Sequence, residues 1–306
     1  MRVIAPASPF DPEAFTRGLD VLSGRLGLVP RLRPDVTARR AYLAGDDQRR
    51  LDEWREAVSD PEARAIFCAR GGYGTMRLLP RIDPAPLLAR PKLLVGFSDL
   101  TALHALLNRA GLATVHGPVV TQLGRLPEDA IAHLEALLSG TAPRSGAWEV
   151  PAPGAGLVAA RTLRPGRASG PLLGGTLALL AHLQGSPFAP RLGGAILFLE
   201  DVGEKPYRID RYLTQLRLAG ALDGLAGLAV GQLTDCDEGG VLAADVVREL
   251  ALELGVPAVE GLPAGHVDGN FALPLGARAT LVAPAPNEEG PPRLLFDGWR
   301  PGRRTA

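Results

Sequence analysis

A serine stands where a buried strand runs into a helix, a place where its hydroxyl could act as a nucleophile. Residues 93–97 form a largely apolar run, Ser98 follows, and a helical pattern begins at Thr101. Gly96 gives a sharp turn room, and the backbone N–H of Asp99 lies at the helix N-terminus, where it could stabilise an oxyanion. Such a serine would be exposed at the carboxyl end of the sheet, where open α/β sheets bind ligands.

The match to the nucleophile elbow of hydrolases is partial. That elbow has the pattern G-x-S-x-G, and Leu100 occupies the position of the last glycine. Ser98 could instead be the N-cap of the helix, a position that serine favours. The segment alone therefore leaves a catalytic and a structural interpretation open.

A glycine-rich loop could bring backbone N–H groups close to such a serine. It follows an apolar strand pattern at 65–69 and has three glycines in four positions, at Gly71, Gly72 and Gly74. Its backbone could approach a ligand closely, as an oxyanion donor must, or it could be an ordinary turn. Arg77 stands where G-x-G-x-x-G needs its last glycine, and no G-x-x-x-x-G-K occurs, so dinucleotide binding is not expected.

A nucleophilic serine needs a base, usually a histidine held by a carboxylate. His266 lies in a glycine-bracketed loop, residues 263–270, without helical or strand periodicity, and is either an exposed side chain or a positioned base. His116 ends a strand pattern at the catalytic edge, and we expect it to line the substrate pocket. Packing or surface roles fit the other three histidines, His104, His133 and His182.

The carboxylate that would orient this base follows a buried strand. The apolar run at 195–199 ends in Glu200 and Asp201. Carboxylates in such a place are costly unless they are paired or hydrogen-bonded. Chemistry alone does not choose between the two acids, and a salt bridge to Arg208 or Arg211 is the structural alternative.

Alternating strands and helices must position these residues. The first half predicts strands at 2–5, 65–69, 92–97 and 113–116 and helices at 12–26, 46–59, 101–109 and 127–138. This alternation is typical of a parallel sheet covered on both faces. The second half predicts strands at 157–163, 195–199, 225–231 and 293–296 and helices at 176–183, 210–219 and 243–254.

A change of composition predicts the domain boundary. Residues 141–156 are rich in Gly, Pro and Ala and have no periodicity, which is typical of a linker. We therefore expect one α/β domain at 1–140, a second at 157–306, and a cleft between them.

The bulk composition narrows the function classes. The 306 residues carry 33 basic and 33 acidic side chains, which gives no reason to expect a nucleic acid or a membrane as partner. Cys68 and Cys236 are too few for a disulfide framework or a zinc site and fit a reducing compartment. Neither a signal peptide nor an apolar run of about 20 residues, the length of a membrane span, is recognisable. We expect a soluble, cytoplasmic protein without a metal or cofactor.

Taken in order, the motifs resemble the LD-carboxypeptidase family of serine peptidases. The resemblance spans nearly the whole chain and rests on IAPASP at 4–9, ARGGYG at 69–74, GFSD at 96–99, GPLLGG at 170–175, LEDVGEKPYRIDR at 199–211, GH at 265–266 and LPLG at 273–276. It implies a flavodoxin-like, parallel-sheet N-terminal domain that carries the serine. It also implies a smaller, β-rich α/β C-terminal domain of the swivelling type, which carries Glu and His, and commonly a homodimer.

The resemblance also implies roles for the candidate residues. Ser98 would attack, His266 would be the general base and Glu200 would orient it, which decides between Glu200 and Asp201. We expect the oxyanion to be bound by the backbone N–H groups of Asp99 and Gly72. We expect the substrate to be bound by Gly71, Tyr73 and His116. Many members have Gly-Gly-Asn where this chain has Thr176 after two glycines. We expect this change to leave the triad intact and to affect packing or substrate choice.

The implied activity is hydrolysis of the L,D-amide bond of a murein tetrapeptide, which releases the terminal D-alanine in cell-wall recycling. Arg70, Arg208 and Arg211 are candidates for binding the substrate carboxylate, and the sequence assigns none of them. A second member type, the microcin C immunity hydrolases, cleaves acyl-sulfamoyl or phosphoramidate aminoacyl nucleotides. Such relatives usually have an aromatic residue in a loop beside the Glu, whereas here only Tyr207 is near, which favours the peptidase. A non-catalytic protein that binds a ligand in the cleft is the third hypothesis, and the retention of all three triad residues argues against it.

Overall fold

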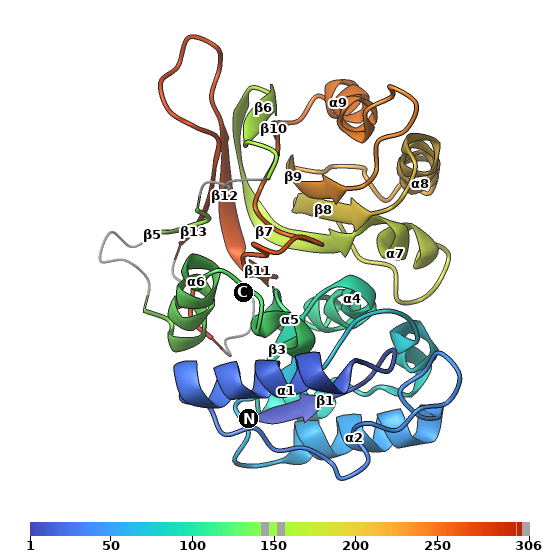
Figure 1. Cartoon of the computed structure of the whole chain (residues 1–306). Helices are drawn as coiled ribbons and strands as arrows, with labels where there is room; N and C mark the ends of the chain where they lie inside the picture. Colours follow the sequence, from blue (N-terminus) through green and yellow to red (C-terminus); the bar gives the residue numbers. More distant parts are fainter. Residues whose placement is uncertain (142–146, 152–156, 298, 302–306) are drawn as a thin grey trace.

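The first of two sheets is built mainly from the N-terminal half. The computed structural model describes residues 1–141, 147–151, 157–297 and 299–301 (Figure 1). Strands β1 (Arg2–Ile4), β2 (Ala65–Cys68), β3 (Leu93–Gly96) and β4 (Thr114–His116) are parallel and lie in this order, and β11 (Leu273–Leu275) pairs antiparallel with β4. A parallel bridge from Arg2 to Arg31 lies at the other edge of β1. When the segment at Arg31 is counted as the second strand of the chain, β1, β2, β3 and β4 become strands 1, 3, 4 and 5. The order across the sheet is then 2-1-3-4-5, which is that of flavodoxin-like folds, as expected.

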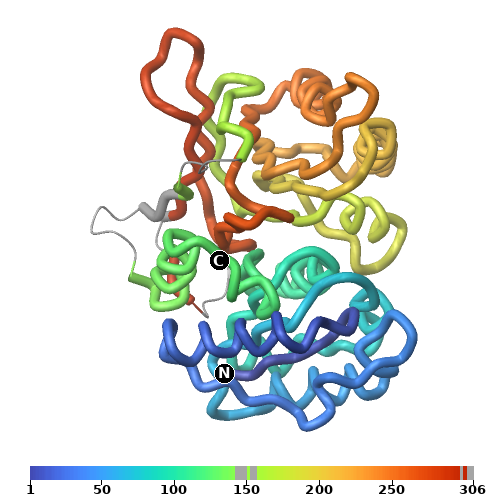
Figure 2. Tube along the Cα trace, viewed as in Figure 1, coloured from blue at the N-terminus to red at the C-terminus, as the bar shows by residue number. Residues whose placement is uncertain are grey.

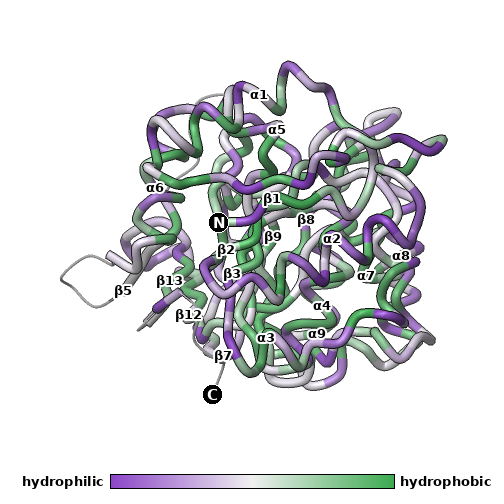
Figure 3. The backbone as a smooth tube through the Cα atoms, turned by 90° about the horizontal axis from the view of Figure 1, so that it is seen from below, coloured by the Kyte–Doolittle hydropathy of each residue, from purple (hydrophilic) through white to green (hydrophobic). Residues whose placement is uncertain are grey.

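Helices cover this sheet. They are α1 (Pro12–Asp20), α2 (Asp47–Ser59), α3 (Ala85–Ala89), α4 (Thr101–Arg109), α5 (Val120–Leu123) and α6 (Glu128–Ser139). Asp11 starts α1 by accepting a hydrogen bond from the N–H of Glu13. All residues of β3 are buried, as in an interior parallel strand. Figure 3 shows β2 and β3 as hydrophobic tubes inside the more hydrophilic helices.

The second sheet contains eight strands among the described residues. Their order is β5 (Ala147–Glu149), β13 (Arg293–Asp297), β12 (Arg278–Ala283), β7 (Gly166–Thr176), β8 (Ile196–Val202), β9 (Gly227–Thr234), β10 (Ala258–Glu260) and β6 (Arg161–Arg164). The four strands from β7 to β10 are parallel, and the flanking pairs are antiparallel. Helices α7 (Leu177–His182), α8 (Pro206–Leu218) and α9 (Ala243–Leu254) lie together on one side of it (Figure 1).

Strand β7 is the longest element that the sequence analysis missed. Residues 166–171 pair with β12 and residues 172–176 pair with β8, so the strand joins both parts of the sheet. Its glycines and its proline are typical of a loop, which is why no strand was predicted. A Cβ on Gly174 would overlap the carbonyl oxygen of Phe198, so a close backbone approach requires the glycine there. Thr176 is the last residue of β7 and the N-cap of α7, so the helix predicted at 176–183 begins one residue later, at Leu177.

The strand predicted at 157–163 was placed too early. Strand β6 begins at Arg161. The backbone before it is bonded to a side chain instead of a neighbouring strand, because Gln232 accepts from the N–H of Val158 at 2.9 Å and donates to its carbonyl at 3.1 Å. The side chain of Gln232 therefore takes the place of a neighbouring strand as the hydrogen-bond partner of the Val158 backbone.

The two sheets share one packed interior. A single cluster of buried apolar residues includes Val115 of the first sheet and Phe198 and Leu281 of the second. The chain also crosses between the sheets, since β11 joins the first (Figure 2). In addition, the indole N–H of Trp299 donates to the carbonyl of Leu137. The linker predicted at 141–156 lies mostly outside the described residues, and its described part contains β5. Among the described helices, none combines the length and apolar character needed to cross a membrane.

Candidate active site

Ser98 lies at the carboxyl end of β3 and begins a single 3-10 turn, Ser98–Leu100. Its φ of +66° is a left-handed conformation that residues other than glycine rarely adopt. The N-cap interpretation is wrong, because Leu100 is the N-cap of α4, Phe97 is that of the turn, and neither element is capped by a side chain. The Ser98 hydroxyl oxygen instead lies 3.0 Å from Nε2 of His266. The strand-to-turn geometry therefore presents the hydroxyl to a base.

His266 joins this serine to a buried carboxylate. Its Nδ1 lies 2.8 Å from Oε2 of Glu200, whose side chain is fully buried, whereas the His266 side chain is 21% exposed. With the ring proton on Nδ1, His266 donates to Glu200 and Nε2 accepts from the Ser98 hydroxyl. Glu200 comes from β8 and His266 from the loop after β10, so the structure brings together three residues that are distant in sequence.

The electrostatics of this pair favour a negatively charged Glu200 and a protonated His266. Burial alone raises the pKa of Glu200, but the hydrogen bond and the charge of His266 outweigh it and lower the pKa below its usual value. Burial likewise opposes protonation of His266, but the hydrogen bond to Glu200 and the Glu200 charge outweigh it and raise the pKa of His266. The imidazole is therefore a stronger base than a free histidine, which suits removal of a hydroxyl proton.

The second oxygen of Glu200 is held by Thr176. The Thr176 hydroxyl donates to Oε1 at 2.6 Å, and both side chains are buried. The Thr176 N–H in turn donates to the hydroxyl of Thr101 at 3.0 Å. Thr176 thus touches the carboxylate directly, which the sequence analysis did not anticipate.

Asp201 serves the backbone and not the histidine. Its Oδ2 accepts from the N–H of Ala178 at 2.8 Å and its Oδ1 from the N–H of Val202 at 2.9 Å. Burial raises the pKa of Asp201 to about 7. Arg208 and Arg211, the salt-bridge alternatives, lie elsewhere, one on Glu204 and the other over the Tyr207 ring.

Two buried amides hold the histidine loop. Asn270 accepts from the N–H of Gly265 at 3.0 Å and donates to Gln122 at 3.2 Å. Gln122 donates to the carbonyl of Val267 at 2.8 Å, which ties the loop to α5. A Cβ on Gly265 would lie 2.6 Å from Oε2 of Glu200, so the loop passes directly over the carboxylate. No pattern in one sequence identifies these amides, because their contacts are long-range.

The glycine loop lies against the serine, as expected. A Cβ on Gly71 would lie 2.8 Å from Cβ of Ser98 and 3.0 Å from its hydroxyl oxygen. Ser8 fixes the loop: its N–H donates to the carbonyl of Gly71 at 3.2 Å, and its hydroxyl accepts from the N–H of Tyr73 at 3.0 Å. Gly72, with a φ of +104°, lies between these bonds. The Tyr73 ring is partly exposed and packs against Tyr42.

The Asp99 side chain joins the serine turn to this loop. Its Oδ2 accepts from both the N–H and the hydroxyl of Thr75, at 2.8 and 2.9 Å. Burial raises the pKa of Asp99. The two expected oxyanion donors, the N–H groups of Asp99 and Gly72, therefore belong to segments that both border Ser98.

His116 lies beneath the site and not on its surface. It is fully buried, and within the described part of the chain neither ring nitrogen has a hydrogen-bond partner. Its ring packs against Phe97 and Phe198, and burial lowers its pKa to about 4. Because the His116 side chain is fully buried, the structure does not place it where we expected it, on the wall of a substrate pocket.

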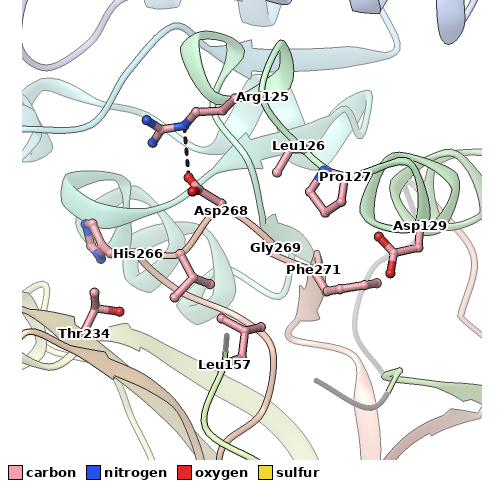
Figure 4. A pocket seen from close by; sticks show the side chains of 11 residues that line it. Arg125, Leu126, Pro127, Asp129, Leu157, Thr234, His266, Asp268, Gly269 and Phe271 are labelled. Carbon is pink, nitrogen blue, oxygen red and sulfur yellow. Dashed lines mark ion pairs between the residues drawn. The ribbon is translucent and has the colours of Figure 1, made fainter. Parts of the chain in front are cut away.

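A cavity of about 700 Å³ opens beside His266 (Figure 4). Its lining consists of Arg125, Leu126, Pro127, Asp129, Leu157, Thr234, His266, Val267, Asp268, Gly269 and Phe271. None of the arginines considered from sequence is among these lining residues, since Arg70 donates to the Pro9 carbonyl and the other two are paired as described. Arg125, which the sequence analysis did not consider, is among the lining residues. The described residues contain no group of His, Cys, Asp and Glu side chains suited to a metal ion.

The site contains a hydroxyl, an imidazole and a buried carboxylate in one hydrogen-bonded chain, and the hydroxyl lies at the carboxyl end of a parallel strand. This arrangement is typical of hydrolases. Comparison with family models agrees. The model of the LD-carboxypeptidase N-terminal domain matches residues 1–117, and that of the LD-carboxypeptidase C-terminal domain matches residues 169–281. The chain belongs to the LD-carboxypeptidase family.

Individual relatives extend over most of the chain. The murein tetrapeptide carboxypeptidase of Pseudomonas aeruginosa is 36% identical over 290 residues, covering 91% of this chain and 92% of that protein. The microcin C7 self-immunity protein of Escherichia coli is 27% identical, with 90% and 88% covered. The crystal structure of the muramoyltetrapeptide carboxypeptidase from Oxalobacter formigenes superposes with a TM-score of 0.84 at 30% identity, covering 98% of this chain and 100% of that one.

Proposed function

We propose that the protein is a serine carboxypeptidase that hydrolyses the L,D-amide bond of murein tetrapeptide and releases the terminal D-alanine. The observation that carries the proposal is the chain of hydrogen bonds from Ser98 through His266 to Glu200. The names of the Pseudomonas and Oxalobacter relatives support the choice of substrate.

In the acylation step, Nε2 of His266 takes the proton of the Ser98 hydroxyl while the oxygen attacks the scissile carbonyl. The carbonyl oxygen becomes an oxyanion, which would accept hydrogen bonds from the N–H groups of Asp99 and Gly72. His266 then gives its proton to the amide nitrogen. The C–N bond breaks, D-alanine leaves as the amine, and the rest of the peptide remains as an ester on Ser98.

In the deacylation step, a water molecule replaces the amine. His266 takes a proton from this water, whose oxygen attacks the ester carbonyl. The proton returns to the Ser98 oxygen as the ester bond breaks, and the tripeptide acid leaves. Throughout, the Glu200 carboxylate stabilises the imidazolium, and Thr176 keeps that carboxylate in place.

The test is mass spectrometry of the purified protein with L-Ala-γ-D-Glu-meso-diaminopimelate-D-Ala, beside Ser98→Ala. Loss of one D-alanine with the wild type alone is the expected result. We expect kcat to fall by roughly 10³-fold or more in Ser98→Ala and His266→Ala. Near-normal turnover by Ser98→Ala would reject the serine mechanism, and labelling of Ser98 by a serine probe without D-alanine release would reject the substrate.

The rival functions can be separated in the same assay. An aminoacyl-sulfamoyl adenosine serves as the substrate of the microcin-type reaction, because one relative is a microcin C7 self-immunity protein. Faster hydrolysis of this compound than of the muropeptide would reverse the assignment. A non-catalytic binder would react with neither substrate and would not be labelled by the serine probe.

The assembly and location are parts of the same proposal. A homodimer in the cytoplasm would fit an enzyme that recycles small muropeptides. Light scattering after gel filtration measures the oligomeric state, and fractionation of cells that produce the tagged protein measures the location.

A further inference from the structure

The cavity beside His266 lies on the leaving-group side of the reaction. His266 borders it, whereas Ser98 and the glycine loop, residues 70–74, are not among its lining residues. A general acid gives its proton to the departing amine, so that amine must lie against the imidazole. Within this mechanism the cavity beyond His266 therefore receives the residue that is cut off, and the acyl part extends in another direction.

Among the described residues that line this cavity, one is an arginine or a lysine. Arg125, in the segment after α5, lies with its Nε 3.5 Å from Oδ1 of Asp268 (Figure 4). The two side chains are 67% and 82% exposed, and an exposed pair at this distance contributes little energy. A ligand can therefore displace Asp268 at small cost. The other acid of the cavity, Asp129, accepts from the N–H of Ala130 at the start of α6, so it faces the positive end of that helix.

We propose that Arg125 binds the free α-carboxylate of the leaving D-amino acid and thereby restricts cleavage to the last residue of the peptide. The proposal rests on the proposed function. The planar guanidinium suits a carboxylate because it can donate two parallel hydrogen bonds, which a lysine cannot. On binding, the substrate carboxylate takes the place of Asp268.

This assignment explains how an open site can act as a carboxypeptidase. The cavity of about 700 Å³ is much larger than a D-alanine, so its walls do not by themselves exclude a longer peptide. A cation in the same cavity as His266 selects substrates by charge, because only a terminal residue offers its α-carboxylate there. The selection would therefore be electrostatic and would depend on one side chain.

The experiment compares the tetrapeptide with its C-terminal amide, in which D-alaninamide replaces D-alanine. The variants are Arg125→Gln and, as a matched control, Arg55→Gln, another exposed arginine that is paired with an aspartate, on α2. A hydrogen-bonded charge pair of this kind corresponds to about tenfold or more in affinity. We expect Arg125→Gln to raise KM for the acid by that factor with little change in kcat. The amide should be a poor substrate of the wild type and indifferent to Arg125→Gln.

A second variant tests the displacement of Asp268. Asp268→Asn removes the competing carboxylate, and we expect KM for the acid to fall by up to about fivefold, the range of an exposed ion pair. An unchanged or higher KM would contradict the displacement.

The outcomes distinguish this inference from the proposed function. Equal hydrolysis of acid and amide by the wild type would overturn the role of Arg125 and leave the hydrolase in place. The same would follow if Arg125→Gln affected both substrates equally or neither. No hydrolysis of either peptide would overturn the proposed function, and the role of Arg125 with it.

Discussion

Ser98 and His266 face each other across the junction of the two sheets, and the chain holds them by different means. On the Ser98 side the backbone fixes the geometry, through a left-handed residue and a glycine loop pressed against it. On the His266 side, side-chain hydrogen bonds fix the geometry: Thr176 holds the carboxylate and Asn270 holds the loop. We therefore expect the geometry of Ser98 to be sensitive to added atoms, and that of His266 to the loss of hydrogen-bonding groups.

The largest effect within this comparison should come from Glu200→Gln. We expect kcat to fall by roughly 10³-fold or more, because an amide can hold the imidazole in the wrong tautomer. The pH profile gives a second readout. Glu200 raises the pKa of His266, so its loss lowers that pKa and moves the acid limb of kcat/KM to lower pH.

Glu253→Gln, at an exposed acid paired with Arg217, is the control for Glu200→Gln. It should leave both the rate and the profile unchanged. An acid limb that stays in place in Glu200→Gln would show that the carboxylate does not set the pKa of His266.

Gly71→Ala tests the backbone side. The new methyl group would lie 2.8 Å from Cβ of Ser98, so the serine or the loop must move. A displacement of about 1 Å at a catalytic group can cost about 10²-fold, which is the fall in kcat/KM that we expect. Gly24→Ala is the control, since nothing lies within 4 Å of its Cβ. Normal kinetics in Gly71→Ala would contradict the contact between loop and serine.

Thr176→Val tests the side-chain side with nearly constant volume. Loss of the hydroxyl leaves Oε1 of the buried Glu200 without this donor, and the cost of about 1–3 kcal/mol corresponds to roughly tenfold or more in kcat. Thr176→Ser should restore most of the rate, because it keeps the hydroxyl. Equal loss in both variants would indicate a packing role. Thr176→Asn asks whether an amide can replace the hydroxyl of the threonine.

The smallest effect should come from a change in the leaving residue. The cavity beside His266 has apolar walls that include Leu126, Leu157 and Phe271. A tetrapeptide that ends in D-leucine should therefore be cleaved at a rate close to that for D-alanine, because a cavity of about 700 Å³ has room for the three additional carbon atoms. Leu157→Trp should reduce this tolerance selectively. Strong rejection of D-leucine by the wild type would place the leaving residue outside the cavity.

Local pattern predicted the first sheet well and the second only in part. The strands β2 and β3 and the helix α4 have buried periodicity of their own, so their positions agree with the predictions to within one or two residues. Strand β7 has no such periodicity, because its glycines lie where a neighbouring backbone comes too close for a side chain. The chemistry follows the same division: local context at Ser98 indicated a nucleophile, whereas His266 and Glu200 became a pair only through the resemblance to a family.

The parallel sheet, the serine at its carboxyl end and the motifs of the family could be predicted from the amino-acid sequence, because strand burial, turns and motif spacing are local properties. Three facts became visible only in the folded chain: Thr176 touches Glu200, His116 is buried, and Arg125 lines the cavity beside His266. These facts depend on contacts between segments that are far apart in the chain. The hydrophobic periodicity of the sequence does not indicate such contacts, because they arise only when the two sheets pack against each other.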